Sequence, residues 1–182
     1  MPIGQAKFGL LGGVDLGSLE LIQTQDVSAV SDIDFTSIEE GVYNVHFLVF
    51  ALPNVTSVLN LRISNNGGTS FISSGYQRAL QYGSVAGSFG EDKSTSATSM
   101  LTFGSSSSGR EKNGYVYLYN LGDSSKYSFA TEHSMNNHSS LGYYFGFAGG
   151  LLPTTEAHNG IQLEGGTGTL TGVASLYGIK ES

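Results

Sequence analysis

The chain contains no cysteine, no tryptophan and only three prolines among its 182 residues. The lack of cysteine excludes a disulfide framework, thiol catalysis and thiolate metal sites. Charge is scarce as well, because charged residues make up 13% of the chain, about half of the usual share. Basic residues number 8 against 15 acidic ones, for a net charge of −7. A nucleic-acid partner requires a basic stripe, so we expect none here.

Long hydrophobic runs are also missing from the sequence. A membrane-spanning helix needs about 18 consecutive apolar residues, and no such run occurs, so we expect no membrane partner. The first residues lack the charged region and the long apolar region of a secretory signal. This predicts a protein that is made in the cytoplasm of the cell that produces it.

The sequence is instead rich in glycine and in two aromatic residues, with 26 glycines, 10 tyrosines and 10 phenylalanines. Low charge, clustered glycine and serine, and runs rich in tyrosine, phenylalanine, valine and threonine are typical of an all-β protein with many tight turns. The length fits a single domain with a sizeable core.

Residues 1–17 differ from the remainder, because glycines interrupt their apolar residues and neither a helical nor a strand period survives. We expect an extended N-terminal arm over 1–17 and a β-sandwich domain over 18–182. Apolar burial alone does not offset the entropy of ordering such an arm, so it is expected to add a strand to the sheet edge of a neighbour. The candidate assembly contacts are Phe8, Leu10, Leu11, Val14 and Leu16.

From residue 18 onward, strand-like runs alternate with turn residues, and no amphipathic helical window occurs. Residues 42–52 form a nearly continuous apolar run, as expected of a strand that is buried on both faces and ended by Pro53. Asn66, Gly67 and Gly68 predict a hairpin turn with positive φ. The polar segments 87–96 and 104–114 are expected to be solvent-facing loops. This pattern predicts an antiparallel sandwich or barrel.

The histidines do not have the spacing of a metal site. His46 lies within the apolar run, which predicts a hydrogen-bonded imidazole in the core. His133 and His138 are five residues apart and face opposite sides of an ideal strand. We therefore expect no metal ion and no cofactor.

The acidic residues and serines do not form a recognisable catalytic constellation either. Asp32 and Asp34 resemble half of a glycosidase pair, but their alternation with apolar residues favours the polar face of an edge strand. Glu91 and Asp92 lack the regular oxygen pattern of a calcium loop. The serines of "GSFGED" and "GSSSSG" lack the G-x-S-x-G context, and the glycines at 165–168 join two strands without opening a helix. No catalytic residue is expected.

Tyr115, Tyr117 and Tyr119 lie two residues apart and therefore share one face of a predicted strand. Such a face could stack sugars, or it could belong to the core or to a subunit interface. The interleaved Val116 and Leu118 favour packing or assembly over ligand binding.

Four segments resemble, in order, those of a family of tailed-bacteriophage virion proteins. The family has a strand ending in FTSL, a turn of the form S-x-x-G-G-x-S-F, a strand G-x-x-Y-L-Y-N and a closing strand T-L-Y-G-I. The similar segments here are 34–38 (DFTSI), 64–71 (SNNGGTSF), 114–120 (GYVYLYN) and 175–179 (SLYGI). The resemblance covers about residues 18–180 and implies a jelly-roll-like β-sandwich in a phage particle.

The resemblance implies a non-enzymatic virion structural protein and supplies no active-site residues. We expect a capsid decoration (cement) protein that forms a homo-oligomer, preferably a homotrimer, and binds the major capsid protein or other virion proteins. The alternative is a receptor- or glycan-binding module of a head or tail fibre, which the short chain disfavours because fibres carry long shafts. An enzyme such as a glycan depolymerase is a third and weaker hypothesis.

Overall fold

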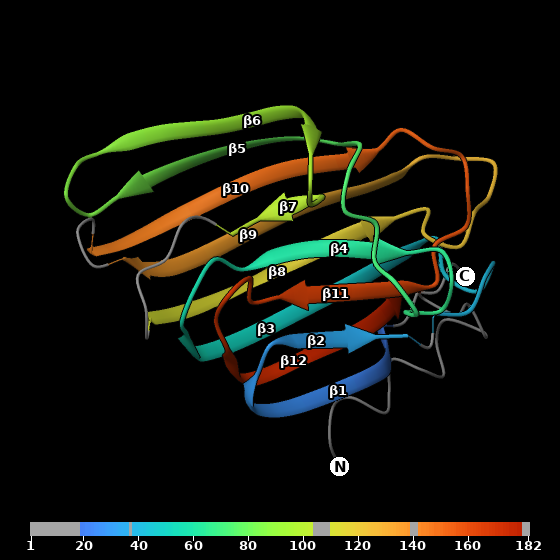
Figure 1. Cartoon of the computed structure of the whole chain (residues 1–182), viewed down its shortest axis with the longest axis horizontal. Coiled ribbons are helices and arrows are strands. Elements are labelled where there is room, and N and C mark those ends of the chain that lie inside the picture. The colour runs from blue at the N-terminus through green and yellow to red at the C-terminus, as the bar shows by residue number, and fades with distance from the viewer. Residues whose placement is uncertain (1–18, 37, 104–109, 139–141, 180–182) are drawn as a thin grey trace, which may run out of the picture.

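The computed structural model describes residues 19–36, 38–103, 110–138 and 142–179. These residues form twelve β-strands and no helix, and the strands build two antiparallel sheets that pack face to face (Figure 1). The prediction of an all-β, antiparallel sandwich is confirmed. The predicted arm at 1–17 lies outside the described residues.

The larger sheet has eight strands. In spatial order these are β1 (Leu19–Val30), β12 (Leu170–Ile179), β3 (Val45–Val55), β8 (Arg110–Tyr119), β9 (Ser128–His138), β10 (Gly142–Leu152), β5 (Tyr76–Ser84) and β6 (Phe89–Ala97). The smaller sheet has four strands, in the order β2 (Asp32–Phe35), β11 (Gly160–Glu164), β4 (Asn60–Ser64) and β7 (Leu101–Thr102).

The connections between the two sheets are those of a jelly-roll-like sandwich. Strands β1 to β4 alternate between the large and the small sheet, and so do β7, β8, β11 and β12. The remaining strands form two inserted hairpins, β5–β6 and β9–β10, and both extend the large sheet beyond β8. The small sheet lies in front of the large one, with β2 close to β12 and β7 close to β10, and the hairpin β5–β6 reaches past it (Figure 1).

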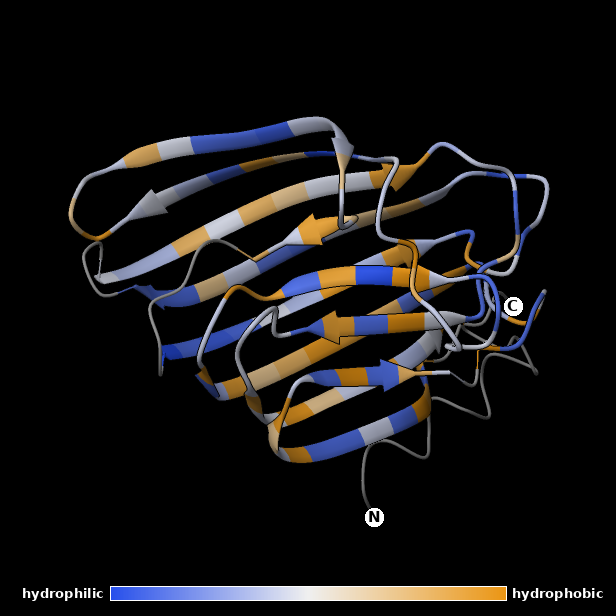
Figure 2. Cartoon of the chain, in the orientation of Figure 1, coloured by the Kyte–Doolittle hydropathy of each residue, from blue (hydrophilic) through white to orange (hydrophobic). Residues whose placement is uncertain are grey.

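The hydrophobic core lies between the two sheets. In β3, every second side chain from Leu48 to Leu52 is buried, and Ile161 and Leu163 of β11 oppose them from the small sheet. Burying one such side chain contributes about 1.5–3 kcal/mol to folding. Figure 2 shows the resulting alternation of hydrophobic and hydrophilic residues along the strands of the small sheet.

Two expectations for β3 are wrong. Phe47, Val49 and Ala51 point away from the core, and Val49 is 36% exposed, so this strand is not buried on both faces within one chain. The strand also continues through Pro53 to Val55, because a register shift between Leu52 and Val55 forms a bulge there. Proline is tolerated at a bulge, where no ladder hydrogen bond is required of it.

The turn at residues 66–68 is not part of a hairpin. Gly67 and Gly68 have φ values of 71° and 84°. However, β4 belongs to the small sheet and β5 to the large one, so this segment crosses between sheets instead of joining paired strands. A Cβ atom on Gly68 would collide with Thr36.

Two segments that we expected to be loops belong to strands. Residues 89–97 form the edge strand β6, and residues 110–114 begin β8. Lys112, which the polar composition of this segment places in solvent, is fully buried. Residues 89–97 are polar because they form an edge strand that faces solvent, and residues 110–114 are polar in part because Lys112 belongs to a buried polar cluster.

Candidate interaction surface

The outward side of the large sheet carries a broad apolar and aromatic surface. On β8, Val116 and Leu118 are fully buried, so the tyrosines that alternate with them point away from the core. The pairing register places further apolar side chains beside them on β3, β9 and β10. We call this surface the aromatic face, and its members are Phe47, Val49, Tyr115, Tyr117, Tyr119, Phe129, His133, Met135, Tyr143, Phe145 and Phe147.

The rings at the centre of the aromatic face pack against one another. The ring centroids of Phe47 and Tyr117 are 4.9 Å apart, and those of Phe47 and Tyr115 are 5.8 Å apart. The hydroxyl of Tyr115 lies 2.9 Å from Nδ1 of His133, and the hydroxyl of Tyr119 lies 3.5 Å from Oγ1 of Thr131. These ring contacts and hydroxyl contacts join the outward side chains of β3, β8 and β9 into one continuous surface.

The most exposed part of the aromatic face lies on the inserted hairpin β9–β10. Met135 is 51% exposed, Phe145 48% and Phe147 46%. Met135 pairs with Phe145 across the two strands, and His133 pairs with Phe147. Single exposed apolar residues are ordinary, but a contiguous set of this size marks an interaction site.

Two shallow grooves lie on the side of the sheet that carries Phe145 and Phe147. One, of about 470 Å³, lies between these rings and Phe89 of β6. The other, of about 440 Å³, lies farther along β5 and β10, where Ala79 and Gly149 have no bulky side chain to cover the backbone, and is bounded by Phe129. This side of the sheet thus combines a ridge of two rings with two hollows.

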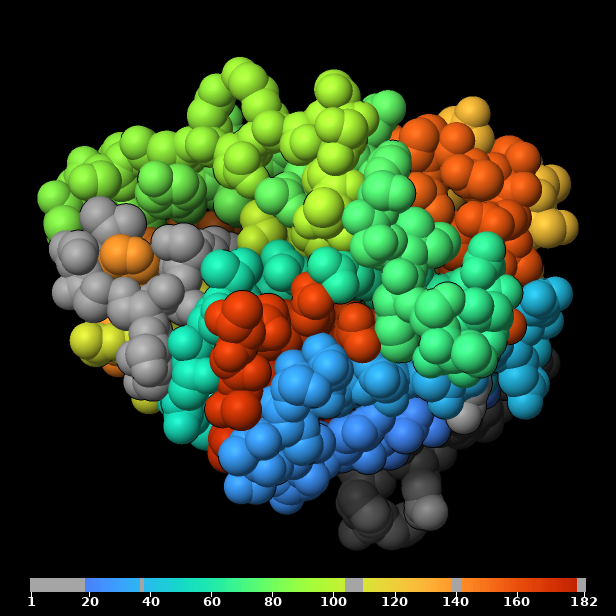
Figure 3. All heavy atoms as spheres, viewed as in Figure 1, coloured from blue at the N-terminus to red at the C-terminus, as the bar shows by residue number. Residues whose placement is uncertain are grey.

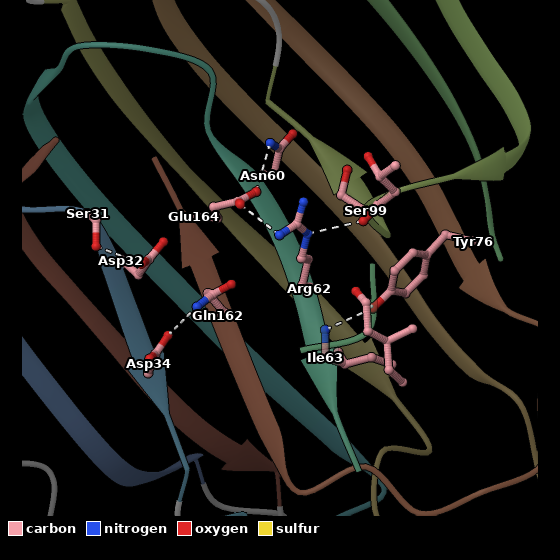
Figure 4. A network of polar contacts seen from close by, with 12 residues as sticks. Ser31, Asp32, Asp34, Asn60, Arg62, Ile63, Tyr76, Ser99, Gln162 and Glu164 are labelled. Carbon is pink, nitrogen blue, oxygen red and sulfur yellow. Dashed lines mark hydrogen bonds and ion pairs between the residues drawn. The ribbon is translucent and has the colours of Figure 1, made fainter. Parts of the chain in front are cut away.

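The outward side of the small sheet is polar and internally paired (Figure 4). Arg62 Nη1 donates to Oε1 of Glu164 at 2.7 Å, and Asn60 Nδ2 donates to Oε2 of the same carboxylate at 3.3 Å. Gln162 Nε2 donates to Oδ1 of Asp34 at 3.0 Å. In Figure 3 the strands of the small sheet lie at the surface that faces the viewer. The two outer faces of the sandwich therefore differ sharply in chemistry.

Asp32 and Asp34 lie on this polar side, on β2 at the edge of the small sheet. Ser31 donates to Asp32 at 2.7 Å. Burial raises the pKa of Asp34, and the nearby Asp32 charge acts in the same direction, whereas the hydrogen bond from Gln162 lowers it. These contacts match the interpretation of the pair as the polar face of an edge strand.

A cleft of about 450 Å³ lies between the inner side of the β5–β6 hairpin and the small sheet. Arg78 spans it, donating from Nη1 to Ser99 at 2.7 Å and from Nη2 to Asp92 at 3.0 Å. The rings of Tyr82 and Tyr144 meet edge to face at 5.9 Å along the same cleft. This lining can stack on a sugar ring and hydrogen-bond its hydroxyl groups.

Ser128, His158 and Glu156 form an arrangement that sequence spacing did not reveal. The hydroxyl of Ser128 lies 2.8 Å from Nδ1 of His158, and Nε2 of His158 lies 3.3 Å from Glu156. Burial lowers the pKa of His158, and the Glu156 carboxylate opposes this shift. Ser128 and His158 are fully buried, so a substrate could not reach the hydroxyl. The three residues instead hold the segment before β11 against the start of β9.

A second buried polar group lies on the inward side of β8 and β9, at Lys112 and Glu132. Lys112 is fully buried and donates from Nζ to the carbonyl of Phe103 at 3.0 Å. Burial raises the pKa of Glu132 to about 8, against the effects of Ser134 and Lys112, and burial lowers the pKa of Lys112 to about 8. Within the described part of the chain, neither carboxylate oxygen of Glu132 has a hydrogen-bond partner.

The histidines do not assemble into a site. His46 is buried as expected, but among the described residues its two ring nitrogens have no hydrogen-bond partner, so the expected hydrogen bond is wrong. Burial lowers the pKa of His46 to about 4. His133 lies on the aromatic face, whereas His138 lines the cleft on the opposite side of β9. Within the ranges that the structure covers, no three His, Cys, Asp or Glu residues group as metal ligands.

The predicted contacts Phe8, Leu10, Leu11, Val14 and Leu16 lie outside the described residues, and their role in assembly stays a prediction. No helix in the described ranges is long and apolar enough to cross a membrane. No family model matches the chain, nor does any curated protein or solved structure.

Proposed function

We propose that this chain is a non-enzymatic structural protein of a tailed-bacteriophage virion, where it acts as a capsid decoration (cement) protein. In this role it forms a homo-oligomer, preferably a trimer, and binds the major capsid protein or another virion protein. Its N-terminal arm contributes to docking. The chain is made in the host cytoplasm and functions in the particle.

The observation that carries this proposal is the contrast between the two outer faces of the sandwich. The small sheet presents polar side chains that pair with one another, whereas the large sheet presents the aromatic face. A face of this kind favours a protein whose function is to be assembled with others. The resemblance of four strand and turn segments to phage virion proteins supports the particle as the place of assembly.

The first test is the composition of the particle. Mass spectrometry of purified virions from the phage that encodes this chain is expected to detect it in the many copies of a decoration protein. Particles that lack the chain are expected to bind purified protein in co-sedimentation. A chain that is absent from purified virions would refute the proposed function.

The arm is tested by deleting residues 1–17. We expect the truncated protein to keep its far-ultraviolet circular dichroism spectrum and to lose co-sedimentation with particles that lack it. Full binding by the truncated protein would show that docking does not require the arm, and the arm would then be removed from the proposal.

The second candidate function is glycan binding by a head or tail fibre module, and the cleft beside Arg78 favours it. Tyr82 offers an aromatic surface there, and Arg78, Asp92 and Ser99 offer polar groups. Glycan-array binding that is lost in Tyr82→Ala and retained in Tyr127→Ala, whose ring is exposed away from the cleft, would favour this function over a decoration role.

A further inference from the structure

We propose that the aromatic face is the contact between copies of this chain, and that the Phe145–Phe147 ridge of one copy seats in the groove over Ala79 and Gly149 of another. This inference rests on the proposed function, since it names the partner that covers the face. In this arrangement the aromatic face contacts another copy of the chain, and the chain contacts the capsid through other surfaces.

The outward side chains of β3 and β10 indicate that a further protein layer covers the aromatic face. Residues 42–52 have the nearly continuous apolar pattern of a strand buried on both sides, yet Phe47 and Val49 face outward. The same holds for β10, where Tyr143, Phe145 and Phe147 are each close to half exposed. A second layer over the large sheet would give these strands the environment that their sequences indicate.

The distribution of charge favours a second copy as the cover. The chain carries a net charge of −7, so two copies repel unless they meet through an uncharged surface. The aromatic face contains no acidic residue and no lysine or arginine. Charged side chains on this side of the sheet lie at its rim, namely Asp26 on β1, Glu91 and Lys93 on β6, and Glu111 at the start of β8. An apolar centre with a charged rim is the usual anatomy of a subunit interface.

The shape of the face supports contact between unlike parts of the same surface. Phe145 and Phe147 form a ridge that lines the groove of about 470 Å³, and the groove of about 440 Å³ lies farther along β5 and β10, over Ala79 and Gly149. Because ridge and groove are different parts of the face, a ridge of one copy can enter a groove of the next, and repetition of this contact can close a ring. This geometry is compatible with the preferred trimer.

The area is that of a stable interface. Side chains of the hairpin β9–β10 expose 39–51% of their surface at Phe129, Tyr143, Phe145, Phe147 and Met135. Half of the roughly 150–250 Å² that an aromatic side chain can bury is on the order of 100 Å². Five such side chains give on the order of 500 Å² per copy, and the six other members of the aromatic face raise this total toward the roughly 800 Å² that is the standard size for one side of a specific interface.

The test is the oligomeric state of the full chain, measured by size-exclusion chromatography with multi-angle light scattering. We expect the wild type to form a closed oligomer. The double variant Met135→Asp/Phe147→Asp is expected to raise the dissociation constant at least about a hundredfold, because it places two charges in the centre of the contact. The matched control is Val42→Asp, which changes a 42% exposed valine in the turn between β2 and β3. It is expected to leave the oligomer unchanged.

A second readout does not depend on the folding of a charged variant. Because the chain has no tryptophan, Phe145→Trp introduces a single indole fluorophore on the ridge. Its emission is expected to be blue-shifted at high concentration and to move toward the solvent value on dilution, whereas Val42→Trp keeps solvent-like emission throughout.

Three results would overturn the inference. The first is a wild type that is monomeric at all concentrations, and the second is an oligomer that the double variant leaves intact. The third is indole emission from the Phe145→Trp variant that is blue-shifted at every dilution but becomes solvent-like when residues 1–17 are deleted. The last result would identify the arm of the same chain as the cover. A monomer that still binds particles refutes this inference and the proposed homo-oligomer but leaves the decoration role standing, whereas an oligomer that is absent from virions refutes the decoration role and leaves the contact between copies standing.

Discussion

Replacing Tyr76 with phenylalanine is expected to destabilise the sandwich through the loss of one hydroxyl group. Tyr76 begins β5 in the large sheet and is fully buried. Its hydroxyl accepts a hydrogen bond from the backbone N–H of Ile63 at 3.1 Å (Figure 4). The same hydroxyl donates to the carbonyl of Ile72 at 3.0 Å. The single oxygen therefore joins β4 of the small sheet to the segment that crosses over to the large sheet.

The expected loss of stability in Tyr76→Phe comes from the two backbone groups that lose their hydrogen-bond partner. Ile63 is fully buried, so its N–H group would lose its partner in the interior, which costs about 1–3 kcal/mol. The carbonyl of Ile72 is only partly buried and would add a smaller loss, so we expect a total of about 2–4 kcal/mol. For a chain of this length, 1 kcal/mol corresponds to about 2–4 °C, which predicts a melting temperature lower by about 4–16 °C.

The assay is thermal unfolding followed by circular dichroism, with both proteins at one concentration because association raises apparent stability. The matched control is Tyr127→Phe, which removes a hydroxyl from a side chain that is 43% exposed. Its free energy of unfolding is expected to change by no more than about 0.5 kcal/mol. If Tyr76→Phe melts together with this control, water replaces the hydroxyl and the connection between the sheets does not depend on it.

The remaining predictions concern a buried acid, a turn and the polar face. Because burial raises the pKa of Glu132 from 4.5 to about 8, its contribution to stability is fully present below pH 4.5 and is lost as the pH rises through 8. Below pH 6.5 the lowered pKa of His46 acts in the opposite direction, so urea titrations between pH 6.5 and 8 are expected to show the decline in stability that Glu132→Gln removes; an equal decline in the variant would refute the assignment. Gly68→Val adds a collision with Thr36 to the strain of positive φ, so thermal unfolding is expected to show a loss of at least about 1 kcal/mol, exceeding that of Gly67→Val, where the added Cβ atom meets nothing. Asp34→Asn is expected to leave no enzymatic phenotype, and polysaccharide hydrolysis that this variant abolishes would contradict a structural role.

Much of the fold could be predicted because alternation reports directly on which side of a strand is buried. The tyrosines at 115, 117 and 119 in β8 show this period of two in the sequence alone. β6 was missed because it is an edge strand with solvent on most of its length, so polar residues carry no cost there. The bulge at Pro53 was missed because its effect depends on pairing with β8 and β12, which lie far away in the sequence.

The candidate surface could be predicted only in part. The three tyrosines of β8 share a face by local spacing, and this was visible without a structure. That Phe47, His133 and Phe147 lie beside these tyrosines on one surface depends on the strand register, which a single sequence does not specify. The buried pair of Lys112 and Glu132 could not be anticipated, because a charged residue in a polar segment ordinarily indicates solvent exposure.

The position of the last two strands has a consequence for the order in which the protein can fold during synthesis. β12 lies between β1 and β3, and β11 lies between β2 and β4, so the strands translated last among those described are interior members of both sheets. Until the ribosome releases them, β1 has no neighbour in the large sheet and β2 has none in the small one. At about 5–20 residues per second, the earliest strands wait on the order of ten seconds or more with their edges open. Chaperones or rapid association between nascent chains would protect those edges, and a ribosome that stalls before residue 160 would release a chain in which neither sheet can close.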